Sequence, residues 1–273
     1  MAVIGVEASH LATVGAELGE GPVWVGRDQA LWFVDIKAPC VHRFRPGEKR
    51  LDSWPAPGQV GWVLPSANGD FLAGLADGVH RFDPAHGRFD PYRTVEADLA
   101  GNRLNDATTD PSGRIWFGSM DNDEVNPSGR FYRLADGLVH DAGLPPVTIT
   151  NGPAVSPDGE TLYTVDTLGR TIDCYSIGAD GAVTGKRRFL SVDPALGYPD
   201  GISTDAEGGL WVGFFGGWAA RRYAADGAVT HEVRFPVANI TKIALGGPDG
   251  RNAFHFISFS ATSRPQSRSS RRA

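Results

Sequence analysis

The chain has 273 residues, of which 35 are Gly and 19 are Pro. These two types make up about one residue in five, against roughly one in eight in average globular proteins, which excludes a helical bundle or a coiled coil. The formal net charge of −6 provides no positive field to neutralise phosphates, so nucleic acid is not an expected partner. A hydrophobic fraction of 41% is enough for a core, and we expect one domain.

No signal for a membrane or for export is present in the sequence. The apolar stretches are far shorter than the ~20 residues of a membrane-spanning helix, and the N-terminus lacks the basic region of a signal peptide. We therefore expect a cytoplasmic protein with no membrane partner. Cys40 and Cys174 lie far apart and outside any Cys/His cluster, so we interpret both as free thiols. The oligomeric state is not predicted.

A short apolar strand recurs along the chain, usually after a Gly or Asp turn, at spacings of about 40 to 48 residues. In most units a second strand follows, and then a hairpin signal such as Asp180-Gly181. This pattern is typical of the four-stranded blade of a β-propeller. We predict an all-β, six-bladed β-propeller over residues 1–257. The six strands are centred on Trp32, Leu72, Trp116, Tyr163, Trp211 and Phe254.

Acidic or amide residues stand beside Gly or Pro at four blade entrances, each 11 or 12 residues before the centre of its core strand. Equal offsets in equivalent blades place the side chains at equivalent heights, so we expect them to surround the propeller axis. Asn-Gly and Asp-Gly are also ordinary turn formers, which is the structural explanation of each motif taken alone. The four residues are Glu20, Asn105, Asn151 and Asp200.

Three of these residues suggest a metal site. Glu20, Asn151 and Asp200 would present two carboxylates and one amide oxygen, a set that suits Ca²⁺, Mg²⁺ or Mn²⁺ and tolerates Fe²⁺. No His or Cys joins them, which argues against a structural tetrahedral zinc site. We predict one divalent cation (Ca²⁺, Fe²⁺, Mn²⁺, Zn²⁺ or Mg²⁺) without fixing its identity.

Five sequence motifs, in the same order along the chain, resemble those of the SMP-30/gluconolactonase/regucalcin family. They are most similar to the motifs of its bacterial pentonolactonases. The resemblance implies a six-bladed propeller with one divalent cation near the axis. It also implies hydrolysis of a sugar lactone, such as xylonolactone, arabinonolactone or gluconolactone, to its aldonic acid. The motifs are Leu-Gly-Glu-Gly-Pro-Val-Trp (18–24), Asn-Arg-Leu-Asn-Asp (102–106), Thr-Asn-Gly-Pro-Ala-Val-Ser-Pro-Asp-Gly (150–159), Tyr-Pro-Asp-Gly (198–201) and Gly-Gly-Pro-Asp (246–249).

The resemblance also assigns roles to residues of this chain. It makes Glu20, Asn151 and Asp200 metal ligands, and Arg103 and Asn105 substrate contacts. A further substrate contact is implied, less firmly, at Asp121. From the chemistry of the ligand set we take Asp200 as the candidate general base, with Asp106 as the second candidate.

Two other functions use the same residues. A calcium-binding propeller without turnover could use the same ligand set, and a related propeller esterase or phosphotriesterase could use the same cation. The motif at residues 102–106 favours the lactonase, whose partner would be a small-molecule sugar lactone.

The end of the chain departs from the family pattern after Ile257. Residues 258–273 are rich in Ser and Arg and poor in apolar residues, which predicts a disordered basic tail. The tail is either an arm for an acidic partner or the product of a reading-frame change that replaced the last strand. We favour the second, because the divergence begins inside an expected strand, and we predict that the last blade is incomplete.

Overall fold

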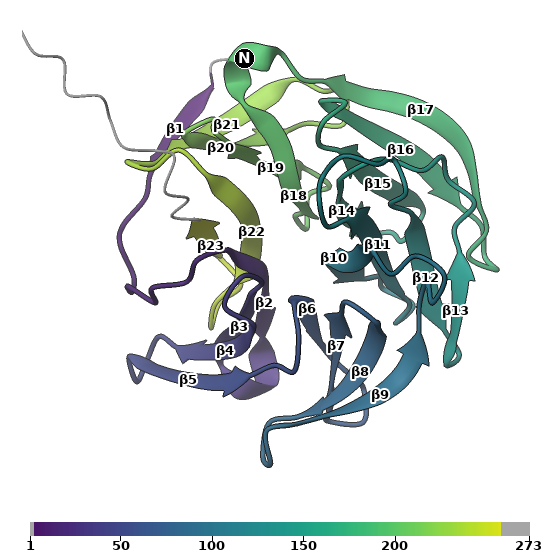
Figure 1. Ribbon diagram of the computed structural model, residues 1–273. Helices are drawn as coiled ribbons and strands as arrows, with labels where there is room; N and C mark the ends of the chain where they lie inside the picture. The colour runs from purple at the N-terminus through teal and green to yellow at the C-terminus, as the bar shows by residue number, and fades with distance from the viewer. Residues whose placement is uncertain (1–2, 258–273) are drawn as a thin grey trace, which may run out of the picture.

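The computed structural model describes residues 3–257, and the predicted basic tail lies outside the described residues. The described chain is an all-β propeller whose sheets are arranged around a common axis (Figure 1). Its helices are two short 3₁₀ turns, η1 (Gly26–Asp28) and η2 (Pro194–Leu196). Neither is long and apolar enough to cross a membrane. Cys40 and Cys174 are free thiols, as predicted.

Five sheets of four or five strands form the blades. Blade 1 contains β2 (Gly19–Val25), β3 (Ala30–Asp35), β4 (Cys40–Arg45) and β5 (Arg50–Pro55). Blade 2 contains β6 (Val60–Pro65), β7 (Phe71–Leu75), β8 (Gly78–Asp83) and β9 (Arg88–Thr94). Blade 3 contains β10 (Asn102–Thr109), β11 (Ile115–Asp121), β12 (Phe131–Ala135) and β13 (Leu138–Asp141). Blade 4 contains β14 (Thr150–Val155), β15 (Thr161–Asp166), β16 (Thr171–Ile177) and β17 (Val183–Ser191). Blade 5 contains β18 (Tyr198–Thr204), β19 (Leu210–Phe215), β20 (Ala219–Tyr223) and β21 (Val229–Arg234), with β1 (Ile4–Glu7) parallel to β21 at its outer edge.

The predicted count of six blades is not confirmed. After blade 5 the described chain adds only a two-stranded sheet, β22 (Ile240–Gly246) and β23 (Asn252–Ile257). The innermost strands nevertheless form a closed ring, because β22 contacts both β18 and β2. The ring therefore closes through β22, whose sheet has two strands among the described residues.

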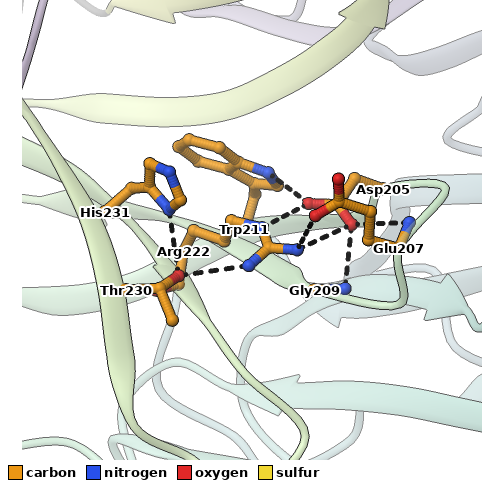
Figure 2. Close-up of polar contacts among 7 residues, drawn as sticks. All are labelled: Asp205, Glu207, Gly209, Trp211, Arg222, Thr230 and His231. Carbon is orange, nitrogen blue, oxygen red and sulfur yellow. Dashed lines mark hydrogen bonds and ion pairs between the residues drawn. The ribbon is translucent and has the colours of Figure 1, made fainter. Parts of the chain in front are cut away.

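The Asp turns before the core strands bind the buried Trp of the same blade. In blade 5, Asp205 Oδ2 accepts a hydrogen bond from Trp211 Nε1 at 2.9 Å, and Asp205 Oδ1 accepts one from the Gly209 backbone N–H at 2.9 Å (Figure 2). Arg222 on β20 donates to the same carboxylate. One side chain thus supports the turn and satisfies the only polar group of the indole. The same pair recurs as Asp28–Trp32 in blade 1 and Asp110–Trp116 in blade 3.

The innermost strands share an irregularity that positions the site. In five of the six, the register shifts so that two residues oppose one on the next strand, a β-bulge. In β6 the shift adds only Gly61. A bulge turns side chains out of the regular alternation, and here it recurs at the same level around the ring. This repetition explains the equal offsets in the sequence. The bulged pairs are Gly21-Pro22 in β2, Asn105-Asp106 in β10, Gly152-Pro153 in β14, Asp200-Gly201 in β18 and Thr241-Lys242 in β22.

Candidate functional site

A cavity of about 550 Å³ is lined by the bulged regions of the inner strands. Five of the seven predicted site residues lie on its wall, although they come from four blades. They are Glu20 on β2, Arg103 and Asn105 on β10, Asn151 on β14 and Asp200 on β18. The structure therefore brings together residues that lie up to 180 positions apart in the sequence.

Asp121 is not on the cavity wall. Its Oδ2 accepts hydrogen bonds from the backbone N–H groups of Asn126 at 2.7 Å and Val125 at 2.8 Å. These two bonds lower the pKa of Asp121 and hold the loop that follows β11. The cavity wall has Asn122 and Glu124 of this loop instead. Sequence reasoning missed both residues because neither belongs to a repeated motif.

Asp106 also lies outside the cavity wall. Its carboxylate is buried and accepts a hydrogen bond from Lys242 Nζ at 2.6 Å, so it forms an ion pair with a lysine of β22. The sequence reasoning missed Lys242 as well. The repeat frame could have found it, because Lys242 takes the bulge position in β22 that Asp106 takes in β10.

The amide of Asn151 has a defined orientation. Thr167 donates its hydroxyl hydrogen to the carbonyl oxygen of Pro199 at 3.0 Å, so it can only accept from Asn151 Nδ2, 2.9 Å away. Asn151 Oδ1 is then on the other side, where it accepts a hydrogen bond from Asn105 Nδ2 at 3.0 Å. The network therefore presents the amide oxygen of Asn151 as an acceptor.

Arg103 supplies a buried positive charge. Its side chain donates from Nη1 to Asn105 Oδ1 at 2.7 Å, and the residue is buried. Burial lowers the pKa of Arg103 to about 10, against the attraction of Glu20, Glu124 and Asp200. The guanidinium is therefore still charged at neutral pH.

Glu20 and Asp200 are buried carboxylates that repel each other. Burial, followed by the charge of Asp106, raises the pKa of Glu20 to about 8. Burial, then the charges of Glu20 and Asp106, raises the pKa of Asp200 well above its usual value. Such carboxylates are unfavourable in the ionised state unless a cation lies near them.

The donor set fits a divalent cation of the hard type. Glu20 and Asp200 offer carboxylate oxygens and Asn151 an oriented amide oxygen, which is the ligand chemistry of Ca²⁺, Mg²⁺ and Mn²⁺. Within residues 3–257 no group of three or more His, Cys, Asp and Glu side chains is arranged to hold a metal ion. A metal site here would therefore rely on the amide of Asn151 as well as on the two carboxylates.

The remaining wall of the cavity carries both polar and apolar side chains. Blades 1 to 3 contribute the polar Lys37, Gln59, Asn122 and Glu124 together with the apolar Leu18, Ile36 and Met120. Besides Asn151, Thr167 and Asp200, the described part of blades 4 and 5 contributes apolar and aromatic side chains, namely Ile149, Leu168, Tyr198 and Phe215. The Tyr198 ring is supported by Arg170, whose guanidinium carbon lies 3.7 Å from the ring centroid. The polar side chains can hydrogen-bond a ligand, while the apolar and aromatic ones can pack against it.

Proteins of one family match this chain over most of its length. The sequence profile described as SMP-30/Gluconolactonase/LRE-like region matches residues 18–255. An L-arabinolactonase from Azospirillum brasilense is 37% identical over 249 residues, which cover 90% of this chain and 82% of that protein. The pentonolactonase XacC from Haloferax volcanii is 31% identical over 243 residues, covering 88% and 81%. The crystal structure of a calcium-binding protein, regucalcin, from Agrobacterium tumefaciens superposes with a TM-score of 0.86 at 28% identity, covering 91% and 85%.

Proposed function

The chain belongs to the SMP-30/gluconolactonase/LRE-like family, and on that premise we propose that it hydrolyses a sugar lactone to the corresponding aldonic acid. The observation that carries the proposal is the cavity that gathers Glu20, Arg103, Asn105, Asn151 and Asp200. The lactonase names of the similar proteins from Azospirillum and Haloferax support the same reaction.

We propose that Glu20, Asn151 and Asp200 hold one divalent cation, of which Ca²⁺, Fe²⁺, Mn²⁺, Zn²⁺ and Mg²⁺ are the candidates. When bound, the cation would act as a Lewis acid toward the lactone carbonyl. The two carboxylates balance its charge, and Thr167 keeps the Asn151 amide oxygen available as the third donor.

The other site residues bind the substrate and move the proton. Arg103 faces the cavity as a hydrogen-bond donor for the ring and its hydroxyl groups, and Asn105 Oδ1 faces it as an acceptor, because both Nδ2 hydrogens of Asn105 are engaged. Asp200 is the candidate base that accepts a proton from the attacking water, because it lies on the cavity wall and burial raises its pKa above the usual value, which makes the carboxylate a stronger base. Asp106 is the weaker candidate, since Lys242 occupies its carboxylate.

The polar and aromatic side chains of the cavity suit the two kinds of surface that an aldonolactone presents. The hydroxyl groups would face Gln59, Asn122 and Glu124, and the C–H face of the ring would pack on Tyr198 and Phe215. Five- and six-carbon lactones, among them xylonolactone, arabinonolactone and gluconolactone, are therefore the proposed substrates.

The proposal is tested with purified protein, elemental analysis and a pH-drop assay on a panel of pentono- and hexonolactones. We expect hydrolysis that a chelator abolishes and one of the candidate cations restores. Stoichiometric cation binding without hydrolysis of any lactone would contradict the lactonase. It would favour the calcium-binding propeller without turnover, the alternative that the likeness to regucalcin supports. Preferential hydrolysis of aryl esters or organophosphates would favour the esterase or phosphotriesterase.

One further proposal and one prediction concern the whole chain. We propose that β22 and β23 are the inner half of an incomplete sixth blade, which the position of β22 between β18 and β2 supports. The cytoplasmic location stays a prediction from the sequence.

A further inference from the structure

A buried lysine crosses the ring beneath the cavity. Lys242 on β22 is only 4% exposed. Its Nζ lies 2.6 Å from Asp106 Oδ1 and donates to the carbonyl oxygen of Ala107 at 3.1 Å. Because Asp106 belongs to β10, this ion pair joins the two-stranded sheet to blade 3.

Gly201 leaves room for the stem of this lysine. A Cβ atom on Gly201 would lie 2.6 Å from Cβ and 2.7 Å from Cγ of Lys242, closer than carbon atoms can approach. Gly201 lies within β18, next to Asp200. The Asp-Gly pair is therefore part of the bulge that Lys242 passes, and the turn-former explanation does not apply to it.

Three consecutive residues of β22 are tied to three different blades. Thr241 Oγ1 donates to the carbonyl oxygen of Gly19 in blade 1 at 2.8 Å. The carbonyl oxygen of Ile243 accepts from Ser203 Oγ in blade 5 at 2.6 Å. These two neutral bonds already join β22 to its neighbours, whereas Lys242 carries a full charge into the centre of the ring.

That charge lies among three buried carboxylates, those of Glu20, Asp106 and Asp200. Electrostatic interactions link both Glu20 and Asp200 to Asp106 and to Lys242. A buried carboxylate is costly without a counter-charge, and three of them exceed what Arg103 alone can balance.

We infer that Lys242 is a positioning residue: an internal cation that holds Asp106, stabilises the carboxylate cluster before metal is bound, and lowers the affinity of the site for a divalent cation. The inference rests on the proposed metal site at Glu20, Asn151 and Asp200, and not on the identity of the substrate.

The test uses single charge changes of opposite sign, with the metal-free full-length protein titrated with Mn²⁺ by calorimetry. Lys242→Met keeps the length of the stem and removes a positive charge, so we expect Mn²⁺ to bind on the order of tenfold more tightly. Asp106→Asn removes a negative charge, so binding becomes weaker by a similar factor. The double variant returns close to the wild-type affinity. The rise in Tm caused by Mn²⁺ is expected to be largest in Lys242→Met, smaller in the wild type and the double variant, and smallest in Asp106→Asn.

Ser203→Ala is the matched control, because it removes a tether of β22 without changing charge. We expect it to lower Tm and to leave the Mn²⁺ affinity unchanged. If Lys242→Met behaves in the same way, Lys242 is only a tether and the inference is wrong. Should Lys242→Met fail to fold, Asp106→Asn decides alone, and unchanged or tighter Mn²⁺ binding by that variant overturns the inference. Lactone turnover by the wild type is measured in parallel. If the variants show the expected shifts in Mn²⁺ affinity but the wild type hydrolyses no lactone, the proposed function is contradicted and the inference on Lys242 stands.

Discussion

Hydrogen bonds within the protein orient polar side chains of the cavity, because the donor groups of Thr167 and Asn105 already have acceptors. Thr167 gives its only hydrogen to Pro199, and this choice determines which end of the Asn151 amide is available. Asn105 in turn donates from Nδ2 to the carbonyl oxygen of Thr150 and to Asn151 Oδ1. The amide of Asn151 is thus oriented before any ligand binds, which reduces the cost of binding.

The orientation of Asn151 gives the first prediction. Thr167→Val removes the acceptor of the Asn151 Nδ2 group, so the amide can rotate and lose its oriented oxygen. We expect Mn²⁺ affinity and kcat to fall by roughly ten- to a hundredfold, the range seen when groups that orient metal ligands are removed. Thr167→Ser keeps the hydroxyl and serves as the control. Equal behaviour of the two variants would contradict the proposed network.

The role of Asp200 gives the second prediction. Asp200→Asn removes both the proposed base and one charge of the ligand set, so kcat falls by ~10²–10⁴-fold and Mn²⁺ binding weakens. Steady-state lactone hydrolysis and metal titration measure the two effects separately. Lactone hydrolysis near the wild-type rate would rule out Asp200 as the base.

At the scale of the element, the repeated unit is a strand pair with a bulge at one end and an Asp turn at the other. The bulge positions side chains at the cavity, and the turn secures the core Trp. Blade 5 shows the second half of this arrangement, where Trp211 and Arg222 both donate to Asp205 (Figure 2). Function and stability therefore depend on opposite ends of the same strands.

Asp205 is the subject of the third prediction. Asp205→Ala leaves the Trp211 indole N–H without its acceptor and removes the main carboxylate partner of the Arg222 guanidinium, which keeps its contacts with Glu207 and Thr230. We expect a loss of about 2–4 kcal/mol in the free energy of unfolding, because hydrogen bonds that involve charged groups are being broken. Urea denaturation measures it. Glu207→Ala is the control in the same turn: its ion pair with Arg222 is exposed, so its removal costs less than about 1 kcal/mol.

The fourth prediction concerns the two-stranded sheet and pH. His255 on β23 packs on Phe235 with ring centroids 4.7 Å apart, and burial lowers its pKa to about 4. The unfolded chain takes up this proton near pH 6.5 and the folded chain only near pH 4. The contribution of His255 is therefore complete above pH 6.5 and is lost as the pH falls toward 4.

The size of the effect follows from the shift. Between pH 7 and pH 5 the folded state loses about 2 kcal/mol through this residue. Urea denaturation of the wild type and of His255→Phe at both pH values measures the contribution as a difference. If the free energy of unfolding has the same pH dependence in both proteins, His255 has the same pKa in the folded and the unfolded chain, and the prediction is wrong.

At the scale of the whole molecule, the ring is closed by β22, whose sheet has two strands within residues 3–257. β22 is held between β18 and β2 by the Ser203 and Thr241 hydrogen bonds and to blade 3 by Lys242. The carboxylate and amide donors come from blades 1, 4 and 5. A bound cation would therefore connect parts of the ring that are distant in the sequence.

The fifth prediction follows from this connection. Saturation with a cation at about a hundred times its Kd stabilises the folded state by about 2.7 kcal/mol. We expect Tm to rise when the chelator is replaced by Ca²⁺ or Mn²⁺, and the rise to disappear in Asp200→Asn. A rise of the same size in this variant would place the binding site elsewhere.

Much of the propeller and of the cavity could be predicted from local patterns. The recurrence of Trp or an equivalent residue every 40 to 48 positions reports the strand that each blade repeats. The offset of 11 or 12 residues reports the bulge, since the same local geometry recurs in each inner strand. Glu20, Asn105, Asn151 and Asp200 were found in this way because each belongs to a repeated local unit.

The rest depends on contacts across the ring. The repeat marks the position of Lys242 in its bulge, but not its partner Asp106. The placement of Asn122 and Glu124 on the cavity wall and the two-stranded form of the last sheet have no local signature. Each results from how the blades close on one another. Ring closure brings together side chains separated by more than a hundred residues, and their partners are selected by charge and space at the axis, which no periodicity along the chain encodes.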